Sequence, residues 1–252
     1  MNENNIKILH TPTKEDPFVI LSKPHGMPSA PLTEYDKNNA FCFAADLFPE
    51  ILNVHGKKKI EHGLLHRLDN DASGLLVIAS TQQAYEELYR SQKNGNFEKI
   101  YSAICVQNVK NAVSLGGFPP VPVIRNMLNG EEFITRSAFR PFGEGHKQVR
   151  PVTSESGLSA ERKAGKAIYD TKIAIKNVEG IFARVQCKIT AGYRHQVRCH
   201  LAWIGLPVLG DKLYNFYFTD KEKILYFKGI MLSFPHPLTG KKLIFTTTDE
   251  IM

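Results

Sequence analysis

The chain has 252 residues, of which 42% are hydrophobic and 23% are charged. This composition is ordinary for a globular protein and excludes an intrinsically disordered or collagen-like chain. No stretch of about 18 apolar residues is free of charge, so we expect no membrane-spanning helix. The chain begins MNENNIK, without the apolar run of a signal peptide, so we expect a cytoplasmic rather than a secreted protein.

Basic residues outnumber acidic ones, with 32 Lys and Arg against 25 Asp and Glu and a net charge of +7. Such an excess suits a polyanionic partner, because Lys and Arg that neutralise phosphates release bound counterions. Residues 136–166 hold seven Lys and Arg against three Asp and Glu, and residues 212–242 hold six against two. Either stretch is expected to face a phosphate backbone or simply to form solvated surface.

The four cysteines are scattered along the chain and form no C-x-x-C pair. They stand at Cys42, Cys105, Cys187 and Cys199. This spacing favours reduced, buried thiols over a disulfide framework or a zinc ribbon.

The predicted elements follow one another without a regular alternation of strand and helix. An apolar run at 18–21 predicts a buried strand, and residues 40–51 predict a short amphipathic helix. Residues 74–79 predict a second buried strand, which is followed by a helix that ends near Lys93. Gly and Pro are frequent in residues 110–130, which predicts a surface loop.

Four further strands and a helix are predicted in the second half of the chain. The strands are expected at 100–106, 133–139, 168–175 and 181–189. A helix is predicted at 194–204, with Val197 and Leu201 on one face and with Arg194 and Arg198 one turn apart. Together these elements predict an α+β fold with a mixed, mainly antiparallel central sheet flanked by helices.

Two polar segments are the candidates for chemistry. Residues 62–76 read HGLLHRLDNDASGLL, so that two histidines, an arginine and two aspartates precede an apolar strand. Strand packing does not require these side chains, and loops held by rigid elements often carry functional groups. Residues 190–201 read TAGYRHQVRCHL. An arginine beside the packed face of a helix can reach a buried carboxylate from the first segment.

Four motifs in the same order resemble those of RNA pseudouridine synthases of the RluA family. They are KPHGMP at 23–28, HRLD at 66–69 with SGLL at 73–76, KIYSA at 99–103, and HQVRCHL at 195–201 followed by GLPVLGDKLY at 205–214. The chain departs from the family at Ala72, where Thr is usual, and at Tyr193, near which the family has an arginine. The resemblance implies the pseudouridine synthase fold with a catalytic cleft between two halves. It also implies an N-terminal segment at 1–17, a catalytic domain at 18–252 and no S4 RNA-binding module.

The resemblance implies that Asp69 is the nucleophile that breaks the glycosidic bond of a uridine. It implies that Arg198 pairs with this carboxylate and that Tyr101 lies beside the base, where it stacks and moves a proton. The reaction has no redox change, so no cofactor and no metal are expected.

The implied substrate-binding residues lie around these three. Arg67 is expected to fill the gap left by the extruded uridine, and Lys23 is expected to contact phosphates. The predicted set is completed by His66, Val197 and His195. The implied partner is structured ribosomal or transfer RNA, and we expect a monomer.

Two alternatives remain open from the residues alone. A metal-dependent hydrolase would use His62 and His66, at a spacing of four, with Asp69, His195 and His200 as further possible ligands. No glutamate follows His62, however, as a helical H-E-x-x-H site requires. A non-catalytic RNA-binding protein would keep the basic loops and tolerate loss of the carboxylate.

Overall fold

The computed structural model describes residues 6–108, 110–122, 132–217 and 224–247. These residues form two compact units. Unit 1 comprises the described residues of Met1–Ile100 and Lys228–Glu250, and unit 2 comprises those of Tyr101–Phe227. Among the described residues, none of the helices is both long and apolar enough to cross a membrane.

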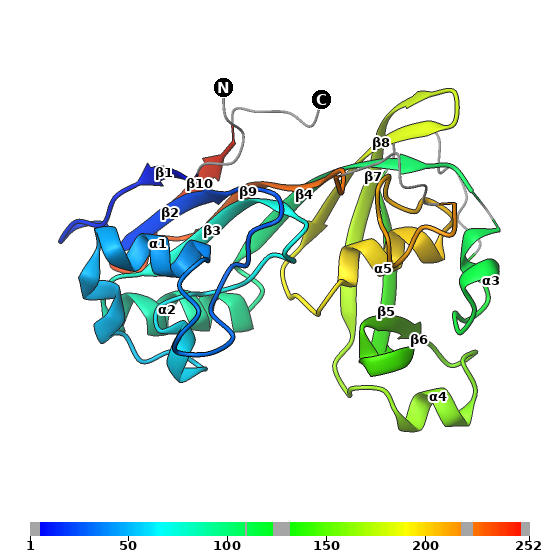
Figure 1. Ribbon diagram of the computed structural model, residues 1–252, viewed down its shortest axis with the longest axis horizontal. Coiled ribbons are helices and arrows are strands. Elements are labelled where there is room, and N and C mark those ends of the chain that lie inside the picture. Colours follow the sequence, from blue (N-terminus) through cyan, green and yellow to red (C-terminus); the bar gives the residue numbers. More distant parts are fainter. Residues whose placement is uncertain (1–5, 109, 123–131, 218–223, 248–252) are drawn as a thin grey trace. The chain divides into compact units, whose positions relative to one another are not determined.

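Unit 1 is built on strands from both ends of the chain (Figure 1). Its elements are β1 (Lys7–His10), β2 (Phe18–Lys23), α1 (Ala40–Leu47), the 3-10 turns η1 (Pro49–Asn53) and η2 (Lys59–Glu61), β3 (Ser73–Ala79), α2 (Gln82–Lys93), most of β9 (Phe227–Pro235) and β10 (Lys242–Thr246). The strand order is β1-β2-β3-β9, with β10 beside β9. The β3–β9 pair is parallel and the other pairs of this unit are antiparallel, so the sheet is mixed as predicted.

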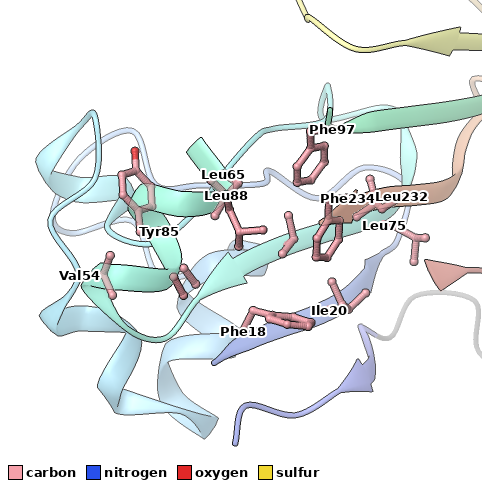
Figure 2. Close-up of a cluster of buried hydrophobic side chains, with 13 residues drawn as sticks. Phe18, Ile20, Val54, Leu65, Leu75, Tyr85, Leu88, Phe97, Leu232 and Phe234 are labelled. Carbon is pink, nitrogen blue, oxygen red and sulfur yellow. The ribbon is translucent and has the colours of Figure 1, made fainter. Parts of the chain in front are cut away.

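The core of unit 1 lies between the sheet and α2. Phe18 and Ile20 of β2 point to the same side as Leu75 of β3, and Leu88 of α2 packs against them (Figure 2). Alternate residues of a strand face opposite sides, so the run FVIL buries both of its faces. Helix α2 begins where the Thr81 hydroxyl accepts a hydrogen bond from the Ala84 amide at 3.3 Å.

Gly74 allows β3 and β9 to approach each other. Its φ angle is +126°, and a Cβ at this position would lie 2.3 Å from the carbonyl oxygen of Gly229 on β9. Only glycine adopts this backbone conformation without strain and leaves room for the neighbouring main chain. The glycine of the SGLL motif therefore permits the close pairing of β3 with β9.

Unit 2 contains a second run of strands and one eight-residue helix. Its elements are β4 (Glu98–Val106, entered from unit 1), α3 (Asn111–Leu115), β5 (Phe133–Phe142), η3 (Glu144–His146), β6 (Gln148–Val152), α4 (Leu158–Arg162), β7 (Tyr169–Glu179), β8 (Phe182–Ile189) and α5 (Gln196–Trp203). The strand order is β4-β8-β7-β5-β6. Cys199 and Ala202 of α5 pack in one cluster with Phe139 of β5, Val149 of β6 and Tyr214.

Three predictions about elements differ from the structure. The predicted helix at 40–51 ends at Leu47, because Pro49 stops it and starts η1. The predicted loop at 110–130 contains α3, although residues 123–131 lie outside the described residues. Helix α5 begins at Gln196, so the prediction that Arg194 shares a helix face with Arg198 was wrong.

Candidate active site

Asp69 lies in a loop that leads into β3, and we define residues 65–72 as the Asp69 loop. Leu68 and Ala72 on either side of it are buried, whereas Asp69 itself is half-buried. The amide of Ala72 donates to the carbonyl oxygen of Asp69 at 3.0 Å. The carboxylate is thus carried by a tight turn whose two ends are anchored in unit 1.

Lys23, at the end of β2, holds the Asp69 loop by hydrogen bonds from its side chain to the main chain of the loop. Its Nζ donates to the carbonyl oxygens of Asn70 at 3.2 Å and of Ala72 at 2.5 Å. The same Nζ donates to the carbonyl oxygens of Pro24 at 2.9 Å and of Met27 at 2.7 Å. One ammonium group therefore ties the KPHGMP segment to the turn that carries Asp69.

Two further side chains of the KPHGMP region reinforce this connection. The Ser29 hydroxyl donates to the carbonyl oxygen of Leu68 at 2.8 Å and accepts from the Leu68 amide at 3.0 Å. His25 Nδ1 lies 2.5 Å from the carbonyl oxygen of Asp71. All of these bonds are made to the backbone of the Asp69 loop, so they fix the path of its main chain without using its side chains.

The position of Lys23 does not suit the predicted contact with phosphate. Its side chain is 0% exposed, and its three N–H donors are shared among four carbonyl oxygens. Burial lowers the pKa of Lys23 to about 8, while the charges of Asp69 and Asp71 act in the opposite direction. Lys23 is a positioning residue for the Asp69 loop.

His66 lies in the interior of unit 1, next to the aromatic ring of Phe97. The two ring centroids are 5.9 Å apart at an interplanar angle of 63°. Both ring nitrogens are buried and have no hydrogen-bond partner among the described residues. Burial, helped by the charge of Lys99, lowers the pKa of His66 well below its usual value, so the ring stays neutral. This environment fits a packing role; the predicted contact of His66 with substrate stays a prediction.

Arg67 points to the surface, and its predicted contact with RNA stays a prediction. Its Nη1 lies 3.2 Å from Oε1 of Glu61, and its side chain is 48% exposed. Surface ion pairs of this kind contribute little to stability, so the side chain is able to leave Glu61 at small cost.

Tyr101 belongs to unit 2 and is held by another aromatic ring. The rings of Tyr101 and Phe227 stack with centroids 5.0 Å apart and an interplanar angle of 5°. The strict alternation of β4 puts Tyr101 on the same buried face as Lys99 and Ala103. The ring is 7% exposed, so its orientation is fixed by packing.

Arg198 of α5 makes a bidentate ion pair within unit 2. Its Nε lies 2.8 Å from Oδ2 of Asp211 and its Nη2 lies 2.7 Å from Oδ1. Both side chains are buried. Oδ1 of Asp211 also accepts the amides of Leu213 and Tyr214, at 2.9 and 3.1 Å. Nothing in the sequence indicates that Arg198 of HQVRCHL pairs with Asp211 of GLPVLGDKLY.

The residues that begin α5 are held in defined positions. His195 has a left-handed backbone (φ +56°), and its Nδ1 lies 3.1 Å from the hydroxyl of Tyr214. Val197 is buried in the first turn of the helix. The ring of Tyr193 stacks on Phe139 at 5.0 Å and 5°, so this departure from the family pattern is used for packing.

Two polar side chains attach α5 to the sheet of unit 2. His200 contacts the hydroxyl of Thr171 through Nδ1 at 2.8 Å and that of Ser137 through Nε2 at 2.9 Å. Burial lowers the pKa of His200 to about 3, so it is a neutral bracing group. Gln196 donates to the carbonyl oxygen of Asp170 at 2.9 Å. Arg198 is therefore carried by a helix that has little freedom to shift.

The structure distributes the predicted catalytic residues over both units. Asp69 belongs to unit 1, and Tyr101 and Arg198 belong to unit 2. Their meeting in one cleft stays a prediction. Residues 62–66 do not form a helix, and the His62 ring stacks on Phe41 at 5.6 Å, so the spacing of a helical zinc site is not present there. In the described part of the chain, His, Cys, Asp and Glu form no group of three or more that could hold a metal ion.

Two curated proteins that are similar to most of this chain are both named as pseudouridine synthases. The tRNA pseudouridine(31) synthase of Saccharomyces cerevisiae is 27% identical over 221 residues, which are 85% of this chain and 48% of that protein. Ribosomal large subunit pseudouridine synthase D of Zymomonas mobilis is 25% identical over 241 residues, which are 92% of this chain and 66% of that protein. The chain thus spans between about half and two thirds of the length of these relatives.

Solved structures share the fold. Human RNA Pseudouridylate Synthase Domain Containing 1 superposes with a TM-score of 0.64 at 18% identity, covering 99% of this chain and 85% of that one. Human RNA Pseudouridylate Synthase Domain Containing 4 gives 0.63 at 17% identity, covering 96% and 87%. A family model described as RNA pseudouridylate synthase matches residues 17–203, a range that includes the Asp69 loop, Tyr101 and α5. The chain therefore belongs to the RNA pseudouridylate synthase family.

Proposed function

We propose that the protein is an isomerase that converts uridine in RNA to pseudouridine, with Asp69 as the nucleophile. The observation that carries the proposal is the Asp69 loop. The side chains of Lys23 and Ser29 hydrogen-bond to its main chain, and the loop carries a half-buried carboxylate in a chain of this family. A nucleophile on a rigid turn has little entropy to lose when the substrate arrives.

The proposed reaction needs no cofactor, because it exchanges one bond for another within a nucleotide. An oxygen of Asp69 attacks C1′ of the ribose as the N1–C1′ bond breaks and leaves its electron pair on N1. The uracil then turns, and C5 attacks C1′ and displaces the carboxylate. C5 loses its proton and N1 gains one, so the number of protons is unchanged. Tyr101, beside the base, is the group proposed to move the C5 proton.

Arg198 is proposed to hold the negative charge of Asp69. Its Nε and Nη2 face Asp211, and its Nη1 carries two further N–H donors that point from another edge of the guanidinium. An arginine held by one carboxylate is well placed to receive a second without reorganising. Such a pair would also keep the pKa of the nucleophile low enough for it to be ionised at neutral pH.

The wider assignments are also proposals. We propose ribosomal or transfer RNA as the substrate, since the matched relatives are named for both. A single catalytic domain spanning 18–252 would contain both units and the cleft, and would act as a monomer in the cytoplasm. Arg67 would replace the extruded uridine in the RNA stack.

Replacing Asp69 by Asn tests the proposal, because it keeps the shape of the side chain and removes its nucleophilic charge. We expect release of tritium from RNA labelled at uridine C5 to fall below detection, while salt-sensitive RNA binding and the urea midpoint stay near the wild-type values. The matched control is Asp71→Asn, in the same loop, which should keep most of the activity. Turnover by the Asp69 variant would overturn the assignment, and absence of turnover in the wild type would favour a non-catalytic RNA-binding protein.

A further inference from the structure

A closed surface loop emerges directly beside the Asp69 loop. Its two ends are joined by main-chain hydrogen bonds, from the Ala40 amide to the Pro28 carbonyl oxygen at 2.9 Å and from the Phe41 amide to the Ser29 carbonyl oxygen at 3.1 Å. We call residues 28–41 the Tyr35 loop. The Ser29 hydroxyl, at the neck of this loop, makes both of the hydrogen bonds to Leu68 described above. The neck is thus attached one residue away from Asp69.

A single carboxylate gives the tip of the Tyr35 loop its shape. Oδ2 of Asp36 accepts the amides of Leu32 and Thr33, at 2.9 and 3.0 Å. The Asp36 amide donates to the Thr33 carbonyl oxygen at 3.2 Å, and Asn39 Nδ2 donates to the Asp36 carbonyl oxygen at 2.9 Å. These bonds close a turn around Asp36, so the tip has a defined conformation although it is on the surface.

Two large hydrophobic side chains face solvent at this tip, among the polar side chains of Thr33, Glu34 and Lys37. Tyr35 is 91% exposed and Leu32 is 80% exposed, the highest values among the large hydrophobic residues that the structure describes. A hollow of about 340 Å³ lies against them, and it is lined by Pro28, Ala30, Leu32, Tyr35 and residues 36–39 of the same loop. The folded unit gains nothing from exposing a tyrosine ring at the end of an ordered turn.

We propose that the Tyr35 loop is a base-stacking platform that binds an unpaired nucleotide next to the uridine held at Asp69. This inference rests on the RNA substrate proposed above. Proteins bind unpaired bases by stacking them on exposed aromatic rings, and such stacking accepts every base because each has a flat face. Leu32 and Pro28 also line the hollow, and so does the positively charged Lys37; the Asp36 carboxylate beside it is already bound by the amides of Leu32 and Thr33.

The attachment at Ser29 links this platform to the reaction. Tyr35 stands six positions after Ser29, so its Cα lies at most about 20 Å from the neck even if the chain between them is extended. Extrusion of a uridine also unstacks its neighbours, and a ring that receives one of them returns part of that free energy. The platform therefore determines which RNA conformations place a uridine at Asp69, and it takes no part in bond breaking.

The test compares Tyr35→Ala with Tyr35→Phe, with unmodified total RNA from cells that lack the protein as the probe. In Tyr35→Ala, loss of one stacked base should raise the dissociation constant about 5- to 150-fold. KM should rise to match, and kcat should stay unchanged. Tyr35→Phe keeps the ring and should retain wild-type values. Because Tyr35 is exposed, neither variant should shift the thermal midpoint.

Tyr217→Ala is the matched control, since it removes another exposed tyrosine, one that belongs to unit 2. An equal loss in both alanine variants, or no loss in Tyr35→Ala, would overturn the platform. A change in oligomeric state without a change in RNA affinity would show that the loop binds a second copy of this chain, and would also overturn it. Repeating the binding measurement with Asp69→Asn protein separates this result from the proposed nucleophile, because that protein binds RNA without turnover.

Discussion

At the scale of single residues, two buried lysines of unit 1 have different surroundings. Lys23 donates to four carbonyl oxygens at the Asp69 loop. Lys99 is 6% exposed, and its Nζ lies 5.5 Å from the centroid of the Phe97 ring. Within the described residues no ion pair is formed by Lys99. Burial alone lowers the pKa of Lys99 to about 8.

Lys99 predicts a particular dependence of stability on pH. Its pKa is about 8 in the folded protein and 10.5 in its ordinary range, so between these values the unfolded chain binds more protons. The free energy of unfolding should therefore rise with pH across this window, by roughly 3 kcal/mol relative to Lys99→Met. Urea titrations of both proteins at several pH values measure the difference. A difference that does not change with pH would mean that Lys99 is better solvated than its burial indicates.

At the scale of elements, apolar strands could be predicted and distant partners could not. The strands β2 and β3 are continuous apolar runs, which lack the spacing of apolar residues that an amphipathic helix shows. The end of α5 could be predicted because Gly205 follows it. Strand β9 pairs in parallel with β3 although about 150 residues separate them, and nothing local to FKGIMLSFP specifies that partner. The short helix α3 is stabilised by tertiary bonds, such as those of Asn111 to Tyr214, rather than by its own propensity.

The candidate site shows the same division between local and distant information. Chemically distinctive side chains such as Asp69 and Arg198 stand out in a sequence. Their partners do not, because a sequence shows that Lys23 and Asp211 are charged but not which group each of them faces. The carbonyl oxygens that Lys23 binds have no sequence signal at all, since every residue has one.

The junction of β3 and β9 predicts a large effect for a small substitution. Gly74→Ala would place a methyl group 2.3 Å from the Gly229 carbonyl oxygen and would strain a φ of +126°. We expect a loss of more than about 3 kcal/mol in the free energy of unfolding, because both strands are buried and cannot separate cheaply. Gly26→Ala is the control: its φ is +77° but no atom lies within 4 Å of the added Cβ. It should cost only about 1–2 kcal/mol. Equal losses in urea titrations would show that close approach is unimportant.

At the scale of the whole molecule, the net charge of +7 is not spread as the sequence indicated. Within the basic stretch 136–166, Arg150 is 1% exposed and donates to the carbonyl oxygens of Gly116 and Val149. Arg136 is paired with Asp170 at 2.7 Å. Three exposed cations of this stretch lie on and just after α4, at Arg162, Lys163 and Lys166, and Lys147 is exposed after η3. Part of the other basic stretch, residues 218–223, lies outside the described residues.

The cations around α4 predict a change in the salt dependence of RNA binding. If Arg162 and Lys163 contact phosphates, replacing both with Gln should reduce the slope of log K against log salt concentration by up to about 2. Lys14→Gln, at an exposed position in unit 1, is the control and should leave the slope unchanged. Filter binding at several salt concentrations measures the slopes. An unaltered slope in the double variant would place the RNA elsewhere.

The way Lys23 holds its turn has a consequence for evolution and design. An ammonium that recognises peptide oxygens is indifferent to the identity of the amino acids that carry them, so the exposed positions 70 and 71 are open to mutational drift while the geometry around Asp69 persists. Ala72 also presents its carbonyl oxygen to Lys23, but its side chain is buried, so packing limits what can replace it. A library of variants at these two positions would therefore change the exposed surface beside Asp69 while the hydrogen bonds of Lys23 are kept.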